Sequence, residues 1–299
     1  MTRKTTTTAK NNRKPKKNKQ PSLTKLRNAW KKANTPKRIL IVGKTLIASI
    51  VALALIVGLV RFVGWRVQVD EAVASQKQLQ TQYDFNPGNI ISDGLFFNGN
   101  ALSEQQVNAI IEKQGAACSG EKCLKSMTFS TESQPANEYC EAYEGEPNES
   151  AAAIIYKSGK ACDISQKVLL TATDPSDFQF KSAMGLSCPD DANCDPEYAG
   201  FFKQVYGAAK RYQYYVQHED RYGYHAGTLN YIQYNPDASC GGSNVYIENK
   251  ATALLYIYTP YQPNEAALAA GAGEGDSCSS YGNRNFSIIY NSMFGSPRG

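Results

Sequence analysis

Acidic residues are absent from the first 44 residues of this 299-residue chain, although that stretch holds fifteen of its 32 Lys and Arg. The rest of the chain carries the other seventeen basic residues and all 27 acidic ones, so it is mildly acidic. The formal net charge of +5 therefore comes from one N-terminal segment. A nucleic-acid-binding domain instead carries its positive charge on a folded surface. We expect no nucleic-acid partner.

Cysteine is absent before Cys118, and histidine occurs only at His218 and His225. No Cys-x-x-Cys pair exists, and neither histidine has a zinc-site spacing to a cysteine pair, so we expect no metal and no cofactor. An even number of cysteines confined to one part of a chain is typical of disulfides in an exported domain. Eight cysteines permit about 105 pairings, among which the sequence alone does not choose. They are Cys118, Cys123, Cys140, Cys162, Cys188, Cys194, Cys240 and Cys278.

One long apolar run extends from residue 39 to residue 60, interrupted by Gly43 and Lys44. As a helix it would be roughly 33 Å long, enough to cross a bilayer core. Lys44 lies near its start and can extend to the headgroups, and Trp65 stands where interfacial aromatics are common. The basic flank before the run predicts a cytoplasmic N-terminus. A cleaved signal peptide is the alternative, but its charged region would be unusually long and no clear small-residue cleavage site follows.

Composition divides the chain into four predicted segments. Residues 1–37 are polar and basic and have too few apolar residues to form a core, so we expect a disordered cytoplasmic tail. Residues 38–65 form the predicted transmembrane helix, and the polar residues 66–83 a short stalk without a coiled-coil heptad run. Residues 84–299 are long enough to bury one core as a disulfide-bonded domain outside the membrane.

Helix signals dominate that domain, which predicts a mainly α (α+β) fold. Ser103 with Gln106, and Asp163 with Gln166, each predict a capping box at a helix start. Asp195, followed by a proline, predicts the start of the longest core helix, in which Tyr198, Tyr206 and Tyr212 pack inward. Further helices are predicted from Ser150, over residues 247–258 before Pro260, from Asn264 and over residues 285–294, with a short hairpin near residues 231–234.

Few motifs in the chain carry chemistry. The glycines of residues 271–275 resemble a phosphate loop only superficially, since a helix rather than a strand precedes them, and we interpret them as a surface loop. A Ser-His-Asp triad is defined by geometry rather than composition, and both histidines flank a polar stretch, so we expect them to be exposed. Tyrosine rings with a polar tip suit stacking on sugars. The surface candidates for this role are Tyr222, Tyr224, Tyr231, Tyr234 and Tyr261.

Eight short segments follow one another between about residues 85 and 295. They are Asn89–Asp93, Lys122–Lys125, Glu149–Ala152, Ala183–Gly185, Phe201–Tyr206, Tyr258–Asn264, Gly273–Cys278 and Tyr281–Phe286. In this order they resemble an actinobacterial cell-surface family often described as haemagglutinin-like. The resemblance implies a lysozyme-like domain, distantly similar to lytic transglycosylases, with peptidoglycan as the ligand. Such an inference from fold analogy does not settle function.

The resemblance also locates a missing catalytic group. Family members continue the helix equivalent to residues 168–170 through a Lys-Glu-Gln-Gly-like stretch, whose glutamate would supply the acid. Here Leu170 runs directly into Thr171, so no residue inherits that role by position. Glu149, Asp174 and Asp177 are the carboxylates that could replace it, provided that one lies within hydrogen-bonding reach of the leaving oxygen.

These observations favour a single-pass protein of the cytoplasmic membrane whose partners are the lipid bilayer and a cell-wall glycan. We expect it to bind peptidoglycan or a related glycan with catalysis lost, using Ala183, Met184, Gly185 and the surface tyrosines. The alternative is an active peptidoglycan hydrolase or lytic transglycosylase with a rearranged carboxylate. The gap after Leu170 favours the first hypothesis.

Four disulfides are expected in this domain. Cys118–Cys123 and Cys188–Cys194 would close local loops, and Cys140–Cys162 and Cys240–Cys278 would close longer ones. A bridge is typically worth about 2 to 4 kcal/mol, with more expected from a longer loop because it restricts the unfolded chain more.

The charge asymmetry predicts the orientation of the chain. A reporter fused after Gly299 should be digested by protease added to intact cells, because the basic flank holds the N-terminus inside. The same reporter fused before Met1 is the control and should be digested only after lysis. Protection of the C-terminal reporter in intact cells would reverse the assignment.

Overall fold

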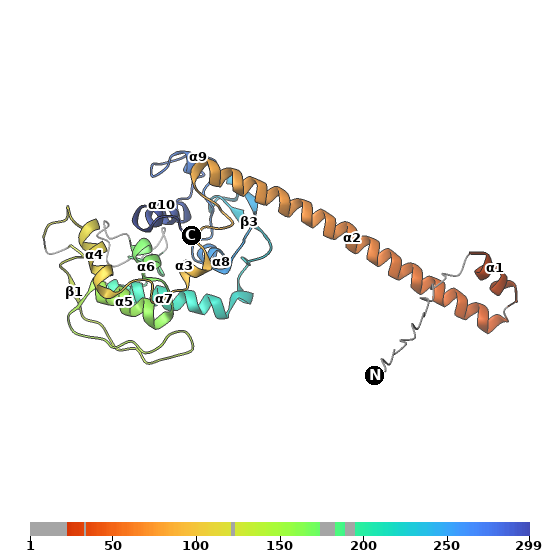
Figure 1. The fold of residues 1–299 in the computed structure, drawn as a ribbon, viewed down its shortest axis with the longest axis horizontal. Helices are drawn as coiled ribbons and strands as arrows, with labels where there is room; N and C mark the ends of the chain where they lie inside the picture. Colours follow the sequence, from red (N-terminus) through yellow and green to blue (C-terminus); the bar gives the residue numbers. More distant parts are fainter. Residues whose placement is uncertain (1–22, 33, 121–122, 174–182, 189–194) are drawn as a thin grey trace, which may run out of the picture. The chain divides into compact units, whose positions relative to one another are not determined.

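The computed structural model describes residues 23–32, 34–120, 123–173, 183–188 and 195–299. Its internal contacts separate two units, Met1–Trp65 and Arg66–Gly299. Most of the described elements are helices, with two short two-stranded antiparallel sheets, as Figure 1 shows. The expectation of a mainly helical chain is therefore confirmed.

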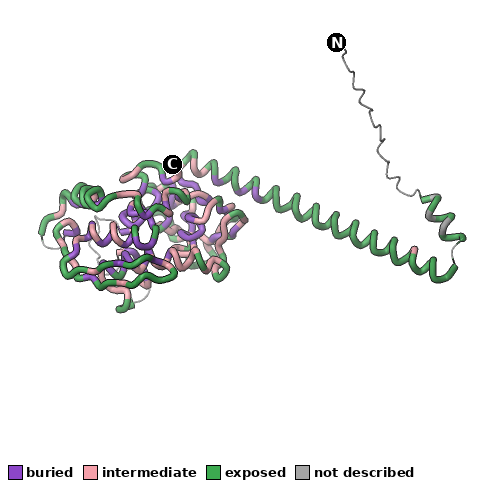
Figure 2. The backbone as a smooth tube through the Cα atoms, turned by 60° about the horizontal axis from the view of Figure 1, so that its bottom comes forward, coloured by how far each residue is buried: buried purple, intermediate pink, exposed green. Residues whose placement is uncertain are grey.

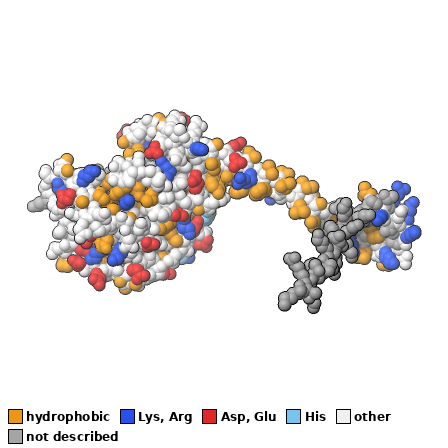
Figure 3. Space-filling view, viewed as in Figure 1, with side chains coloured by type: hydrophobic (Ala, Val, Ile, Leu, Met, Phe, Trp, Pro, Cys, Tyr) orange, Lys and Arg blue, Asp and Glu red, His pale blue; other side chains and the backbone are white. Residues whose placement is uncertain are grey.

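The first unit consists of helix α1, Leu23–Lys32, and the N-terminal part of helix α2, Thr35–Tyr83. Hydrophobic side chains from Ile39 to Trp65 are nearly all exposed, and hydrophobic atoms follow part of the visible length of α2 in Figure 3. A continuous apolar surface of this kind needs an apolar environment. By length and composition α2 is able to cross a membrane, as the sequence predicts.

The expected disordered tail does not extend over residues 23–32. These residues form α1 because Leu, Lys, Arg and Ala, all good helix formers, make up most of the segment. Lys31 and Lys32 also lie in the last turn, where positive charge interacts favourably with the helix dipole. Residues 1–22 lie outside the described part of the chain.

The predicted stalk is instead the C-terminal part of α2, and it packs into the second unit. Val69, Ala72 and Gln76 are buried, and Leu79 and Tyr83 are partly buried against the same core. These five residues are spaced alternately by three and four, which places them on one face of a helix. Residues 66–83 therefore belong to the folded domain, as the colour change along the helix in Figure 2 illustrates.

The Gln76 side chain pairs with both backbone groups of a residue that lies 170 positions later in the sequence. Its Oε1 accepts a hydrogen bond from the Tyr246 N–H at 2.8 Å, and its Nε2 donates to the Tyr246 carbonyl at 3.1 Å. The Asn86 side chain accepts a further bond from Gln76 Nε2 and also binds the N–H of Gly88. A Cβ atom at Gly88 would overlap both the Gln76 amide and the Tyr246 carbonyl. The amide of Gln76 thus replaces a neighbouring strand at the edge of β4, Gly242–Tyr246.

The second unit is built around one hydrophobic core, to which α5 and α7 contribute many of the residues. Helix α7 packs on α5, α6 and α8, and α5 also packs on α4. Strand β3 pairs antiparallel with β4, and β1 with β2. The remaining bounds are α3 Asp93–Phe96, α4 Glu104–Gln114, β1 Thr128–Phe129, β2 Glu149–Ser150, α5 Ala151–Cys162, α6 Gln166–Thr173, α7 Phe201–Gln217, β3 Leu229–Gln233, α8 Lys250–Tyr258, α9 Glu265–Ala269 and α10 Gly282–Phe294.

Several predicted helix ends are confirmed and two are wrong. Ser103 and Gln106 form the capping box of α4, and α8 ends before Pro260. Asp163 does not begin a helix but ends α5 in a left-handed conformation, and its carboxylate accepts the Gly99 N–H. Asp195 caps only the short turn Pro196–Tyr198. Helix α7 starts later, at Phe201, because Gly200 has a φ of 106° that a helix does not tolerate.

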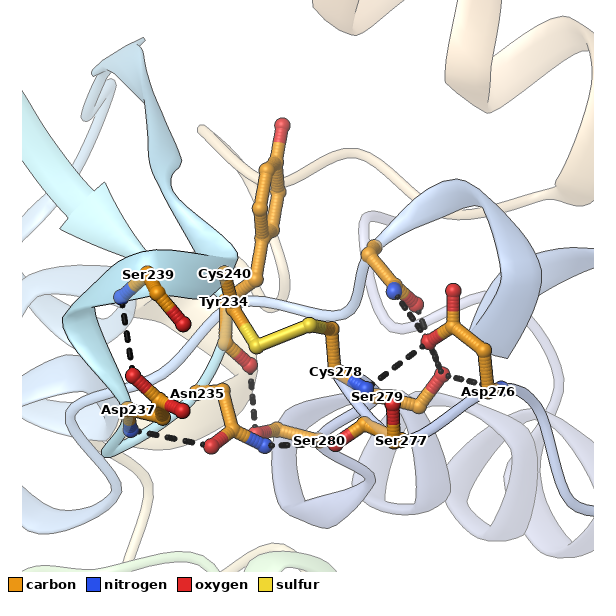
Figure 4. The surroundings of a disulfide bond; sticks show 11 residues. Tyr234, Asn235, Asp237, Ser239, Cys240, Asp276, Ser277, Cys278, Ser279 and Ser280 are labelled. Atoms are coloured by element: carbon orange, nitrogen blue, oxygen red, sulfur yellow. Dashed lines mark hydrogen bonds between the residues drawn. A yellow bond between two sulfur atoms is a disulfide. The ribbon is translucent and has the colours of Figure 1, made fainter.

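Three of the four expected disulfides are present, Cys118–Cys123, Cys140–Cys162 and Cys240–Cys278. The fourth expected pair includes Cys194, which lies outside the described residues. Cys240–Cys278 joins the β3–β4 turn to the glycine-rich loop after α9, and hydrogen bonds flank it on both sides in Figure 4. Ser280 Oγ donates to the Tyr234 carbonyl at 2.6 Å beside the bridge. The glycine-rich segment is therefore a tethered surface loop, as predicted.

Gln76→Met should destabilise the second unit, because it retains most of the side-chain volume but leaves the Tyr246 N–H and carbonyl unpaired. We expect a loss of about 1–3 kcal/mol in the free energy of unfolding. Denaturant unfolding of the full-length protein in detergent, followed by near-ultraviolet circular dichroism of the tyrosines, measures this loss. Lys77→Gln, on the exposed side of the same turn, is the matched control. Equal stability of the two variants would show that this contact contributes nothing.

Candidate binding groove

One face of α7 lies outside the hydrophobic core and borders a cavity of about 520 Å³. Lys203, Gly207, Lys210 and Tyr214 follow one another along this face at intervals of four, three and four residues. The opposite wall comes from residues 132–139, more than 60 positions earlier in the chain. Gly207 leaves room for the Leu186 side chain, because a Cβ there would meet Leu186 Cδ2 at 2.7 Å.

A second cavity of about 350 Å³ extends the first toward β1, and the two share Glu132, Phe202 and Lys203. We call the combined depression the α7 groove. Its lining includes two carboxylates and three cations. The carboxylates are Glu132 and Glu197, and the cations are Lys203, Lys210 and Arg211. The residues around the larger cavity are Glu132, Gln134, Tyr139, Glu197, Tyr198, Phe202, Lys203, Tyr206, Gly207, Lys210, Arg211 and Tyr214.

Stacked aromatic rings form the base of the groove. The Phe202 and Tyr206 rings stack with centroids 5.5 Å apart, and the buried Tyr143 ring contacts both. Tyr206 is only 5% exposed, and its hydroxyl has no hydrogen-bond partner among the described residues. Burial raises the pKa of Tyr206, although the nearby Asn137 side chain opposes the rise, so the hydroxyl keeps its proton at neutral pH. Tyr206 thus lines the groove with its ring, while its hydroxyl is covered from solvent.

A second aromatic cluster closes one end of the groove. Tyr139 contacts His218 through its hydroxyl, 3.1 Å from Nε2, and its ring meets that of Tyr214 edge-on. Arg211 lies over the Tyr214 ring, with the guanidinium carbon 5.6 Å from the centroid. These contacts fix the orientation of two lining tyrosines before any ligand is bound, which lowers the entropy cost of binding.

Behind the groove wall lies a buried carboxylate. Glu149 is 2% exposed, and its Oε2 accepts hydrogen bonds from Thr131 at 2.5 Å and from Tyr143 at 2.6 Å. Its Oε1 forms an ion pair with Lys157, which also contacts the exposed Glu146. Burial alone would lower the pKa of Lys157, but the hydrogen bonds and charges of the two glutamates outweigh it and raise this pKa. The ammonium therefore remains charged and compensates the buried carboxylate.

These contacts occupy both oxygens of the Glu149 carboxylate and connect it to the groove wall. Thr131 directly precedes the lining residue Glu132, and Tyr143 supports the aromatic base, so Glu149 holds the groove wall from behind. Glu149 itself lines none of the described cavities. The other two sequence candidates, Asp174 and Asp177, lie outside the described residues.

The predicted glycan-binding residues lie apart from this groove. Met184 is buried, and the segment around it is fixed by Gln204, which accepts the Met184 N–H, and by the Tyr258 hydroxyl, which donates to the Met184 carbonyl. Tyr222 packs edge-on against Tyr215, and Tyr224 packs near Tyr256. Of the other three tyrosine candidates, Tyr231 lies on β3, Tyr234 follows β3 directly, and Tyr261 follows α8. Ala183 and Gly185 are the sequence neighbours of Met184.

Tyr231 is the most accessible of these tyrosines, with 58% of its surface exposed, and the Tyr234 ring points away from the hydrogen bonds around the disulfide in Figure 4. Neither of the two cavities of the α7 groove is lined by a predicted glycan-binding residue. The structure therefore separates two tyrosine-bearing surfaces that the sequence does not distinguish.

Sequence reasoning missed the α7 groove because it placed Tyr198 and Tyr206 in the core. Tyr206 is buried, but Tyr198 is only half-buried, and both line the cavity. The sequence did contain a sign that this helix face is not buried. Three cations, Lys203, Lys210 and Arg211, lie along it, and a helix face inside a core would not carry three cations. Among the described residues no group of three or more His, Cys, Asp and Glu gathers as a metal site.

No family model, no curated protein and no solved structure matches this chain. The haemagglutinin-like resemblance therefore depends on the sequence segments alone, and the functional argument depends on the groove.

Glu149→Gln should destabilise the groove wall, because it removes the charge that compensates Lys157. Breaking a buried ion pair typically costs about 3–5 kcal/mol, and we expect a loss on the order of 2 kcal/mol here, since Lys157 retains Glu146. Urea unfolding of the full-length protein in detergent measures it. Glu146→Gln removes the exposed partner of the same lysine and should change stability by less than about 1 kcal/mol. A smaller effect at Glu149 than at Glu146 would contradict the structural role.

Proposed function

We propose that this protein is a membrane-anchored glycan-binding protein of the cell surface, with its disulfide-bonded domain outside the membrane and peptidoglycan or a related cell-wall glycan as its ligand. The observation that carries the proposal is the α7 groove, in which oriented tyrosines stand beside unpaired polar and charged side chains. Sugars offer this combination of partners, because their C–H faces stack on rings while their hydroxyls form hydrogen bonds.

Three further features support the proposal. The candidate membrane helix and the three disulfides fit an anchored domain in an oxidising compartment. The sequence segments resemble a lysozyme-like cell-surface family. Two neighbouring cavities that share Glu132, Phe202 and Lys203 also make up the groove, which suits an extended chain better than a small compact ligand.

Loss of catalysis is part of the proposal. A glycosidase needs a carboxylic acid whose pKa is raised by burial, placed within reach of the leaving oxygen. Among the described residues Glu149 is the buried glutamate, and its oxygens are occupied by Thr131, Tyr143 and Lys157. The described part of helix α6, Gln166–Thr173, contains no glutamate, whereas the family that the sequence resembles has one on the equivalent helix.

Full-length protein in detergent should sediment with insoluble peptidoglycan and release no soluble muropeptides. Tyr198→Ala removes one lining ring and should weaken binding about 2-fold to 10-fold, the range measured for single aromatic contacts. The matched control is Tyr231→Ala, which removes an exposed ring on β3 outside the groove. Binding that is lost with Tyr231 and kept with Tyr198 would move the site to the hairpin surface.

A hydrolase remains the second candidate because Glu132 and Glu197 line the same groove. Two carboxylates on opposite sides of a sugar are the general requirement of glycoside hydrolysis. Muropeptide release that is abolished by Glu132→Gln or Glu197→Gln would establish this alternative. Release abolished only by Asp174→Asn or Asp177→Asn would place the acid in the segment after α6.

A further inference from the structure

Three cations line the α7 groove without a carboxylate partner. Lys203, Lys210 and Arg211 all come from α7, and no ion pair among the described residues includes any of them. Glu132 and Glu197 line the same groove and are equally unpaired, so the cations exceed the carboxylates by one. Lys157, in contrast, is paired with two glutamates. The groove thus retains positive charge for a ligand.

The cations are arranged along the axis of the groove. Lys203 and Lys210 are seven residues apart, which corresponds to two helical turns and roughly 10.5 Å along α7. This distance is close to the length of one disaccharide in an extended glycan strand. Charges on a ligand would match both lysines if they recurred at every second sugar.

An independent observation comes from Tyr206. Its hydroxyl is covered from solvent and has no partner of standard hydrogen-bond geometry among the described residues, with the Asn137 side chain as a polar neighbour, although buried polar groups in folded proteins are nearly always hydrogen-bonded. Tyr206 lines the groove, so a bound ligand would supply the missing acceptor once the side chains that cover the hydroxyl shift on binding. A sugar oxygen or a carboxylate has the required chemistry.

We propose that the α7 groove selects a glycan that carries a carboxylate on about every second sugar. Lys203, Lys210 and Arg211 bind the carboxylates, and the Tyr206 hydroxyl donates a hydrogen bond to the strand. This inference depends on the proposed function and specifies its ligand class. The carboxylates could belong to the sugars themselves or to peptides attached to them, and the test separates these sources.

Four polymers provide the test with full-length protein in detergent. Purified peptidoglycan is compared with the same material after its carboxyl groups have been coupled to methylamine. Hyaluronan, whose repeating disaccharide carries one sugar carboxylate, is compared with carboxyl-reduced hyaluronan. We expect binding to fall at least 5-fold on carboxyl modification, and to weaken with added salt, because charge contacts at a partly exposed surface are screened. Binding of hyaluronan identifies sugar carboxylates as sufficient, and binding of peptidoglycan alone identifies the peptide carboxylates.

Two variants test the named residues. Lys203→Gln with Lys210→Gln should weaken binding of the unmodified polymer about 10-fold and that of the modified polymer by less than 2-fold. Lys160→Gln, an exposed lysine of α5 outside the groove, is the control. Tyr206→Phe should weaken binding of both polymers about 3-fold to 10-fold without lowering stability, because the hydroxyl it removes has no hydrogen-bond partner of standard geometry in the described part of the chain.

The outcomes distinguish this inference from the proposed function. Equal binding of modified and unmodified polymers, with both weakened by Tyr198→Ala, would refute carboxylate selection and retain glycan binding. A Tyr206→Phe variant that binds normally but unfolds more easily would assign that hydroxyl to the fold and remove it from the site. Absence of binding to all four polymers would overturn both.

Discussion

A buried negative charge constrains the part of the domain that forms the groove. A carboxylate removed from water is stable only when it is paired and hydrogen-bonded, and Glu149 meets this condition with three donors from three segments. Thr131 and Tyr143 belong to the wall, and Lys157 belongs to α5, which packs directly on α7. The wall therefore has a defined position relative to α7 because each of these segments must reach the same carboxylate.

Gln76 performs a similar task where α2 enters the domain. Its side-chain amide presents an N–H and a carbonyl oxygen side by side, and these pair with the backbone carbonyl and N–H of Tyr246. An apolar residue at this position would pack but would leave both backbone groups of Tyr246 unpaired. Together with Val69 and Ala72 it makes residues 66–83 part of the folded unit, so a fragment that begins after Tyr83 would lack part of its core.

The two buried polar contacts also bear on function. The carboxylate that is best placed by burial to act as an acid is already neutralised by Lys157, whereas the groove carboxylates Glu132 and Glu197 are exposed. The proposal of glycan binding without cleavage depends on this difference between the buried, paired carboxylate and the two exposed ones.

The sequence by itself determined the features that depend on neighbouring residues. The apolar run of α2, the absence of acidic residues before it, the capping box at Ser103 and the stop before Pro260 all depend on side chains within a few positions of one another. Only the tertiary structure decided the roles of Gln76, Glu149 and Tyr206. Gln76 pairs with a residue 170 positions away, Glu149 takes its donors from three different segments, and Tyr206 lines a groove whose other residues come partly from another segment. Helical spacing predicts which residues of α7 share a face, but it does not predict whether that face meets a core or a groove. That depends on where residues 128–139 pack, and their position is fixed by a buried charge whose partners the local sequence does not reveal.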